Sequence, residues 1–400
     1  MGKTYARIYQ GIMKVANYLL PWRMPEVIKG ENSILKLPKL IKDKGFHNVL
    51  IVTDSMLMSL HLLDALLDNL KKEEIKYAIY DGVNPNPTDV NVNEGIKLYK
   101  ENKCEAMIAF GGGSPMDCAK AIGAKLVKPK KNIQQLQGLL KVLKQIPTIF
   151  TVPTTAGTGS ETTIASVITI EATHHKASIN DLCLMPKYAI LDPKLTVGLP
   201  QKVTSTTGLD ALCHAVEAYT NNTYNSKLEK RLCKDAVKLI YDNLYNAYLD
   251  GSNIEARENM QEAAFFAGRA FTRGSVGYVH AIGHTLGGLY GVPHGLAMSI
   301  LLPHVLKEYG SKAYAKLADL ADVCGIKTKT GTKEEKAKAF IKWIEDMKVK
   351  MNIPLYPDMI KEEDIDQIVE WATKEANPLY PTPVYWNKKH FKTFIKSLHE

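Results

Sequence analysis

The chain has 400 residues, of which 45% are hydrophobic and 23% charged, and its formal net charge is +9. This composition is that of an ordinary globular protein, and the length exceeds what one hydrophobic core usually serves, so we expect two domains and exclude a disordered chain. No run of about 18 apolar residues is uninterrupted, and we therefore expect no membrane span.

The first half of the chain alternates short β-branched runs with amphipathic stretches. This pattern predicts helices at 57–72, 89–102 and 115–127 and strands at 47–53, 76–80, 106–110, 148–152, 166–170 and 188–191. Strands that alternate with helices form βαβ units and therefore a parallel sheet. We predict an α/β domain over residues 1–200.

The texture changes after Leu199-Pro200, where strand-like runs disappear. Long helical patterns then follow one another at 206–219, 227–249, 254–270, 295–309, 333–350 and 361–374. We predict an all-helical domain over residues 201–400.

The positive charge and the cysteines indicate neither nucleic-acid binding nor export. Only six of the 51 basic residues are arginine, and the lysines are spread along the chain, whereas nucleic-acid-binding proteins concentrate charge on one face. The six cysteines include no CxxC pair, and the opening residues lack an apolar segment followed by a small-residue cleavage site. We expect a cytoplasmic protein with reduced thiols and no nucleic-acid partner.

A glycine-rich segment, GGGSPMD at 111–117, follows a predicted strand and opens a predicted helix. Glycines let a backbone approach a pyrophosphate closely, and the N-H groups at a helix start stabilise its charge. We expect Ser114 to cap this helix and the segment to bind phosphate, although an ordinary turn is the alternative. The motif is not GxGxxG, so the usual Rossmann fingerprint is absent.

Two further features at strand ends suit a nucleotide. The segment PTTAGTGSE at 153–161 offers hydroxyls for ribose and phosphate oxygens, although ordinary loops have a similar composition. Asp54 ends the first strong strand, where a carboxylate can accept a bond from a ribose 2'-hydroxyl and repel a 2'-phosphate. Such a residue favours NAD over NADP, but an aspartate at this place also caps helices.

A carboxylate and several histidines indicate a divalent metal. Asp210 and His214 are one helical turn apart, and His280, His284 and His294 lie in an apolar, glycine-rich segment where unpaired imidazoles would be poorly solvated. Core histidines bonded to backbone carbonyls are the alternative. Spacing leaves open which of the three later histidines bind. One carboxylate with imidazoles suits Fe2+ or Zn2+ rather than magnesium or calcium.

Taken together and in this order, GGGSPMD, PTTAGTGSE, GLDALCHAVEAY and the segment 280–294 resemble the iron-containing (group III) alcohol dehydrogenase family over essentially the whole chain. The resemblance implies a dehydroquinate synthase-like architecture, with an N-terminal dinucleotide-binding α/β domain and an all-α C-terminal domain. It also implies an active site in the cleft between them and a homodimer or larger homo-oligomer.

The resemblance also implies roles for individual residues. The metal ligands, for Fe2+ or Zn2+, fall on Asp210, His214, His280 and His294. His284 is left near cofactor and substrate, and Phe271 keeps an apolar wall at the catalytic centre. The implied contacts to NAD, with NADP less favoured, are Asp54, Asn86, Gly112, Gly113, Ser114, Asp117, Thr154, Thr155, Thr158, Thr163 and Lys176.

The implied reaction is hydride transfer between a nicotinamide and an alcohol or aldehyde. Two departures bear on the substrate: Ala165 stands where some diol-oxidising members carry asparagine, and the ending NPLYPTPVYWNKKHF differs from the NPR type of many relatives. A lyase like dehydroquinate synthase is one alternative, but its phosphate-bearing substrate would need a basic pocket that these motifs do not offer. A non-catalytic metal- or nucleotide-binding protein is the other.

Overall fold

The structure, a computed structural model, describes residues 2–173 and 175–398. They form two compact units, one of them Trp22–Gly198 and the other the described residues of Met1–Pro21 and Leu199–Glu400. Among the described residues, no helix combines the length and the apolar character needed to cross a membrane.

The α/β unit is built on a six-stranded, all-parallel sheet with the order β1-β9-β6-β4-β2-β3. A smaller sheet has the order β5-β8-β7, with β7 antiparallel to β8. The strands are β1 (Glu26–Lys29), β2 (Asn48–Val52), β3 (Lys76–Tyr80), β4 (Ala106–Gly111), β5 (Gly138–Leu139), β6 (Thr148–Pro153), β7 (Ala165–Ile170), β8 (His175–Asn180) and β9 (Tyr188–Leu191).

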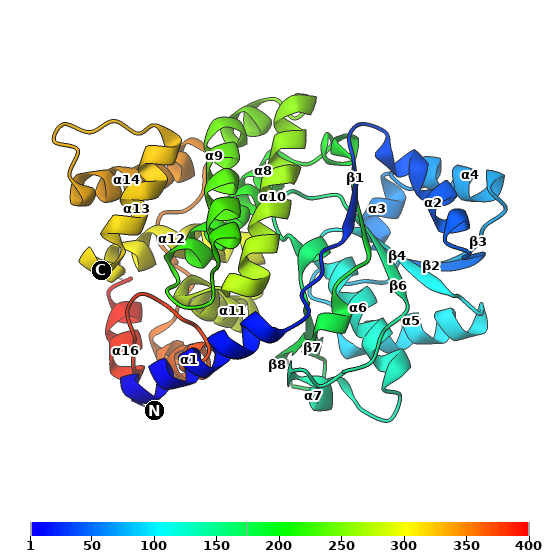
Figure 1. The fold of residues 1–400 in the computed structure, drawn as a ribbon, viewed down its shortest axis with the longest axis horizontal. Helices are drawn as coiled ribbons and strands as arrows, with labels where there is room; N and C mark the ends of the chain where they lie inside the picture. The colour runs from blue at the N-terminus through cyan, green and yellow to red at the C-terminus, as the bar shows by residue number, and fades with distance from the viewer. Residues whose placement is uncertain (1, 174, 399–400) are drawn as a thin grey trace. The chain divides into compact units, whose positions relative to one another are not determined.

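Helices cover both faces of the large sheet because its strands alternate two sets of apolar side chains (Figure 1). Leu50 and Val52 belong to a core shared with α5 and α6, whereas Val49 and Ile51 belong to a core shared with α2 and α4. The helices of this unit are α2 (Leu37–Asp43), α3 (Ser55–Ser59), α4 (Asp64–Lys72), α5 (Asp89–Glu101), α6 (Gly113–Val127) and α7 (Ile133–Leu136).

The prediction of a single helix at 57–72 is wrong, because the chain forms the two helices α3 and α4 there. His61, between them, has a φ of 58°, which a continuing α-helix cannot accommodate.

The helical unit centres on α8, which is buried along most of its length and packs against α9, α10 and α12. Its helices are α1 (Lys3–Leu19), α8 (Gln201–Thr220), α9 (Lys227–Leu249), α10 (Ile254–Gly274), α11 (Tyr278–Tyr290), α12 (His294–Tyr309), α13 (Ser311–Cys324), α14 (Lys333–Lys350), α15 (Ile365–Ala376) and α16 (Lys388–Lys396). A second core forms where Trp386 stacks on Tyr278, with ring centroids 4.5 Å apart.

The N-terminal segment belongs with the helical unit, whereas the expected division placed it in the α/β domain. The buried Gln10 of α1 donates hydrogen bonds to the carbonyl oxygens of Pro378 and Tyr380, both at 2.9 Å. Arg7 donates to the carbonyl oxygen of Thr382 at 2.8 Å. These bonds connect the two ends of the chain. The predicted boundary at residue 200 kept the N-terminal segment apart from the helical domain, because contacts between distant parts of the chain leave no local sequence pattern.

Candidate functional site

Four of the predicted site residues converge inside the helical unit. Asp210 and His214 lie one turn apart on α8, His280 lies in the first turn of α11, and His294 is the first residue of α12. One potential ligand atom from each of them lies within 4.8 Å of the others. The structure therefore brings together the four residues that the resemblance implied as metal ligands.

The charged forms of two of these groups are disfavoured in the structure as it stands. Burial, and the nearby Glu217, raise the pKa of Asp210 to about 8. Burial, with a smaller contribution from His284, holds the pKa of His280 well below its usual range. Asp210 Oδ1 and His280 Nε2 are buried and have no hydrogen-bond partner among the described residues, although His294 Nε2 lies 3.4 Å from Asp210 Oδ1.

A bound divalent cation would remove this cost, because it stabilises the carboxylate and takes up the lone pair of a neutral imidazole. One carboxylate oxygen and three imidazole nitrogens are donors that suit Fe2+ or Zn2+. The residues present therefore fit the metal that the resemblance implied.

Glu217 orients His280 and was missed in the sequence. It lies on the same face of α8, seven residues after Asp210, and its carboxylate accepts hydrogen bonds from the backbone N-H of Gly277 at 2.8 Å and of Val279 at 2.7 Å. Nδ1 of His280 lies 2.6 Å from Glu217 Oε2 and is placed to donate to it, which directs Nε2 toward the cluster. Burial raises the pKa of Glu217 to about 8, while these hydrogen bonds lower it. The helical spacing of residues 210, 214 and 217 could have revealed Glu217, because it places all three side chains on one face of the helix.

His214 and His294 are held by packing. Phe271 of α10 stacks on the His214 ring, with centroids 4.1 Å apart and planes 12° apart. Next to His294, a Cβ on Gly295 would lie 2.6 Å from the carbonyl oxygen of Thr206, which is backbone of α8 and cannot move aside easily. Glycine at 295 therefore lets the start of α12 approach α8 closely enough to bring His294 to the cluster.

His284 lies beside the cluster but outside the group of four. Its ring centroid is 5.3 Å from that of His294, and its Nδ1 lies 2.7 Å from Glu375 Oε1 on α15. The same Glu375 oxygen accepts a hydrogen bond from the Tyr380 hydroxyl at 2.8 Å. Neither Glu375 nor Tyr380 was predicted, and Tyr380 belongs to the C-terminal segment that departs from the family pattern.

The two glycine-bearing loops lie side by side in the α/β unit. They follow β4 and β6, which are neighbours in the sheet, and the N-H of Thr154 donates to the carbonyl oxygen of Gly111 at 3.1 Å. A Cβ on Gly112 would lie 3.3 Å from Thr155 Oγ1, and one on Gly113 would lie 3.1 Å from Thr158 Oγ1. The structure therefore brings these predicted cofactor contacts into one patch.

One detail of the first loop differs from expectation. Ser114 does not cap α6, because the helix already begins at Gly113, and its hydroxyl donates to the carbonyl oxygen of Pro85 at 2.6 Å. Asp117, whose cofactor contact stays a prediction, accepts bonds from Ser160 Oγ at 2.8 Å and from the N-H of Val167 at 3.0 Å.

A buried lysine, which sequence reasoning missed, ties α6 to the second loop. Lys120 Nζ donates to Ser160 Oγ and Thr163 Oγ1, both at 2.8 Å, and to the carbonyl oxygens of Ser160 at 2.7 Å and Ala165 at 2.9 Å. Burial lowers the pKa of Lys120 to about 8, while the charges of Asp117 and Glu161 raise it. In the sequence, the feature that could have revealed Lys120 was a lysine on the apolar face of a predicted helix. Thr163 and Ala165 thus take part in an internal network.

The remaining cofactor candidates lie at the ends of β2 and β3 and on β8. Asp54 Oδ1 caps α3 by accepting from the N-H of Leu57 at 2.9 Å. Asn86 Oδ1 accepts from Lys176 Nζ at 3.0 Å, so these two candidates are in contact. Because the chain runs from β2 outward to β3 and returns to β4 on the other side of β2, the sheet has its topological switch point between β2 and β4, where α/β proteins bind ligands.

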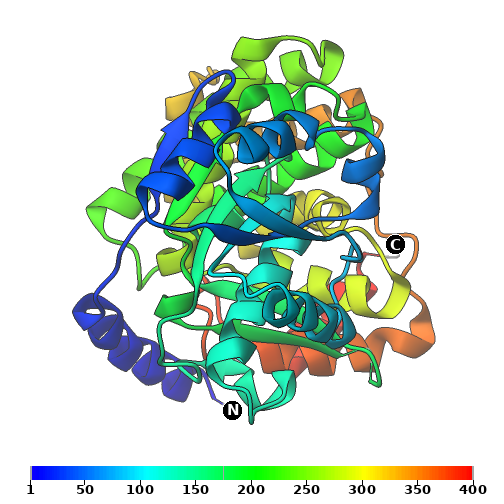
Figure 2. The ribbon, with the colours of Figure 1, turned by 90° about the vertical axis from the view of Figure 1, so that its right-hand side faces the viewer.

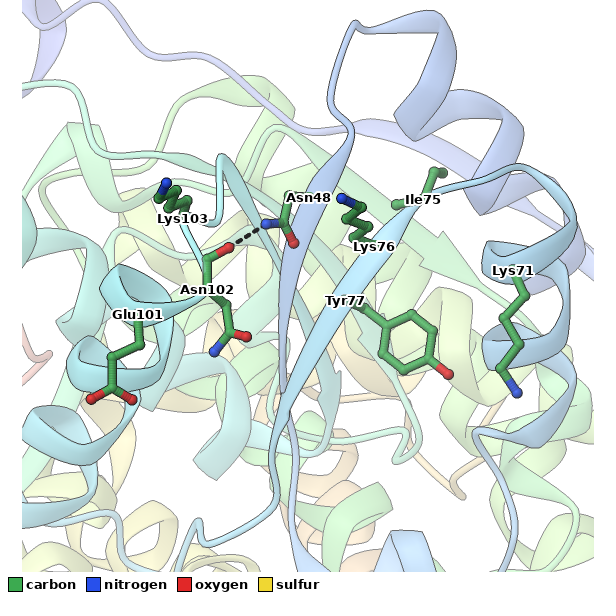
Figure 3. Close-up of a pocket in the computed structure, with 8 residues that line it drawn as sticks. All are labelled: Asn48, Lys71, Ile75, Lys76, Tyr77, Glu101, Asn102 and Lys103. Carbon is green, nitrogen blue, oxygen red and sulfur yellow. Dashed lines mark hydrogen bonds between the residues drawn. The ribbon is translucent and has the colours of Figure 1, made fainter.

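One surface hollow lies away from this chemistry. It encloses about 580 Å³ and is lined by Asn48, Lys71, Ile75, Lys76, Tyr77, Glu101, Asn102 and Lys103 (Figure 3). Asn48 and Lys76 open β2 and β3, so the hollow is at the amino edge of the sheet, whereas the glycine-bearing loops follow the carboxyl edge. It is no part of the predicted cofactor site.

Comparison with known proteins agrees with this geometry. The family described as iron-containing alcohol dehydrogenase matches residues 25–193, and the C-terminal family of Fe-containing alcohol dehydrogenases matches residues 204–399. Alcohol dehydrogenase 4 of Schizosaccharomyces pombe is 39% identical over 361 residues, which cover 88% of this chain and 84% of that protein. The 1,3-propanediol dehydrogenase of Klebsiella pneumoniae is 37% identical over 352 residues, covering 87% and 90%.

A solved structure extends the agreement to the fold. The crystal structure of a 1,3-propanediol oxidoreductase superposes with a TM-score of 0.91 at 34% identity, covering 95% of this chain and all of that one. The fold class predicted from the sequence is thereby confirmed. The chain belongs to the iron-containing alcohol dehydrogenase family.

Proposed function

We propose that the protein is a metal-dependent, NAD-linked alcohol dehydrogenase that also works as an aldehyde reductase. The observation that carries the proposal is the cluster of Asp210, His214, His280 and His294, in which two buried polar atoms lack a hydrogen-bond partner among the described residues. Family membership supplies the reaction class, and it disfavours both a lyase and a non-catalytic binding protein.

When bound, the cation polarises the substrate oxygen and the nicotinamide carries the hydride. The chain's own residues hold and orient these groups. Glu217 keeps Nε2 of His280 directed toward the cluster, and Phe271 holds the plane of His214. In the α/β unit, Gly112 and Gly113 let the loop after β4 pack closely on Thr155 and Thr158. The N-H groups at the start of α6 would stabilise the charge of a bound pyrophosphate.

His284 is proposed to move a proton at Nε2. Glu375 accepts from Nδ1, which leaves Nε2 as the atom that can take a proton from the substrate hydroxyl through a ribose hydroxyl or a water. His284→Ala should lower kcat by about 10²-fold, the usual size of such a contribution, while the bound metal remains. Steady-state kinetics and metal analysis of the variant test this.

A matched control for this variant is Tyr380→Phe, which removes the other hydrogen bond to Glu375 and leaves the imidazole in place. We expect a much smaller loss of kcat in this control. Metal loss in His284→Ala would instead make this histidine a ligand, and an unchanged kcat would leave it only an orienting role.

Asp54 is proposed to select NAD. Asp54→Asn removes the negative charge that would oppose a 2'-phosphate, and it keeps a side-chain oxygen for the cap on α3. The ratio of kcat/KM for NADP to that for NAD should rise by about tenfold, which corresponds to about 1.4 kcal/mol of relieved repulsion. Asp54→Gly should act in the same direction, and an unchanged ratio in both variants would show that Asp54 does not read the ribose.

Several finer features belong to the same proposal. We propose that Trp22–Gly198 is the dinucleotide-binding domain and that the helical unit is the metal-binding domain. A cytoplasmic location is supported by six cysteines without disulfides. The substrate is proposed to be a small alcohol or aldehyde. No particular diol is assigned, because Ala165 departs from the pattern of some diol-oxidising members and the C-terminal segment departs from that of many relatives.

The proposed function is tested by combining metal analysis with turnover. Protein purified without oxygen should contain about one Fe2+ or Zn2+ per chain, because the cluster offers one carboxylate and three imidazoles. With NAD it should form NADH from members of a panel of primary alcohols and diols, and with NADH it should reduce the corresponding aldehydes. Metal binding with neither net NADH formation from any alcohol nor reduction of any aldehyde would contradict the proposed dehydrogenase and favour the lyase-like enzyme or the non-catalytic binding protein.

A further inference from the structure

Helix α1 buries only Ala6 and Gln10 and leaves a row of apolar side chains exposed. Gln10 is buried and bonded to two backbone carbonyls of the C-terminal segment, so this face holds the helix on its unit. The other side carries five apolar side chains that are each 54–74% exposed, namely Tyr5, Ile8, Ile12, Val15 and Leu19. Figures 1 and 2 show α1 on the outside of the helical unit. An apolar stripe of this kind marks an interaction surface.

The spacing of these five residues indicates what covers them. Along the chain they alternate steps of three and four residues, which is the repeat of the seam along which two α-helices pack together. The stripe is two heptads long and lies on a helix that the rest of its unit already holds in place. A partner helix can therefore dock without the cost of first ordering α1.

The charges of α1 are kept away from the stripe. Lys3, Arg7 and Lys14 lie together on the opposite side, and the first 25 residues contain no Asp or Glu. The positions that flank the seam are all uncharged: Thr4, Tyr9, Gly11, Ala16 and Tyr18. Two identical helices of one charge sign would repel each other if charges flanked their seam. This arrangement avoids that repulsion, and it also leaves no lysine beside the stripe to meet an anionic membrane.

We propose that α1 is a self-association surface that pairs with α1 of a second copy of this chain. The pairing is antiparallel about Ile12, so that Ile8 faces Val15 of the second copy and Tyr5 faces Leu19 of the second copy. Antiparallel packing also opposes the two helix dipoles favourably. The surface precedes the residues that the family profiles match, 25–193 and 204–399, and it does not depend on the proposed reaction.

The first test measures the mass of the native protein by light scattering. Ile8→Glu combined with Ile12→Glu places like charges in the seam and should halve the mass of the assembly. The matched control is Lys3→Glu combined with Lys14→Glu, which changes the charge of the same helix by a larger amount on the side away from the stripe and should leave the mass unchanged. An equal mass in wild type and seam variant would overturn the proposal.

The second test protects against misfolding of a charged variant. Ile12→Cys is a mild change at the centre of the seam, and a short bis-maleimide should link two copies through it, above the background of the wild-type cysteines. In the antiparallel pair, residue 5 of one copy lies far from residue 5 of the second copy, so Tyr5→Cys should not link. Absence of linkage at Ile12→Cys would overturn self-pairing, and linkage at Tyr5→Cys would overturn the antiparallel arrangement.

The third test separates a copy from a membrane. Wild-type protein should not co-sediment with vesicles that contain phosphatidylglycerol. Binding to these vesicles that the seam variant abolishes, with no change of mass between the two proteins, would assign the stripe to a lipid surface and overturn the proposal.

Discussion

His280→Ala is expected to purify without its metal and to lose turnover by about 10³-fold or more, since the cation supplies several kcal/mol to the transition state. The reason lies in the position of Nε2, which is buried in the cluster without a hydrogen-bond partner among the described residues. Alanine offers no donor atom, and the remaining three ligands leave the site open. Metal analysis and kcat/KM for a primary alcohol measure the two effects.

A second variant and a control keep this result interpretable. His294→Ala should behave in the same way, and because His294 is only partly buried at the start of α12, its loss should disturb folding less. His304→Ala is the matched control: it removes a histidine of the same helix whose Nε2 bonds to the carbonyl oxygen of Leu355 outside the cluster. Full metal content in both ligand variants would refute the assignment.

The fold could be predicted to the extent that local patterns determine it. The strands Asn48–Val52 and Ala106–Gly111 lie where apolar runs placed them, because both faces of a central parallel strand are buried and the signal is strong. The edge strand Lys76–Tyr80 also lies where it was predicted, although it is only partly buried. The strand Glu26–Lys29 was missed because it has four residues whose side chains are mostly exposed. Helix α11 was missed because its three glycines, which have a low helix propensity, weaken the helical pattern.

The site residues that belong to sequence motifs were found. The residues that reach the site only through long-range packing were not. The ligand candidates were identified by type and spacing, but spacing alone did not separate His284 from His280 and His294. The structure separates them, because Glu375 of α15 holds His284 outside the cluster. Lys120, fully buried in a network that joins α6 to the second loop, could not be found by spacing, because its partners become neighbours only on folding.

Glu217→Ala is expected to weaken both the metal site and the fold. The carboxylate receives the N-H groups of Gly277 and Val279 and faces Nδ1 of His280, so its removal leaves three buried polar groups unpaired. At about 1–3 kcal/mol for each unsatisfied group, the free energy of unfolding should fall by about 3 kcal/mol or more. Loss of the group that orients a ligand should also lower metal affinity by about 10- to 100-fold.

Denaturant unfolding of metal-free protein and competition with a chelator separate these two effects. Glu375→Ala is the matched control, because it removes a partly exposed carboxylate that bonds to His284 rather than to His280. It should leave metal affinity unchanged and cost less stability. Should Glu217→Ala bind metal as tightly as the wild type, the orientation of His280 would have to come from the packing of α11 against α12 alone, and Glu217 would stabilise only the start of α11.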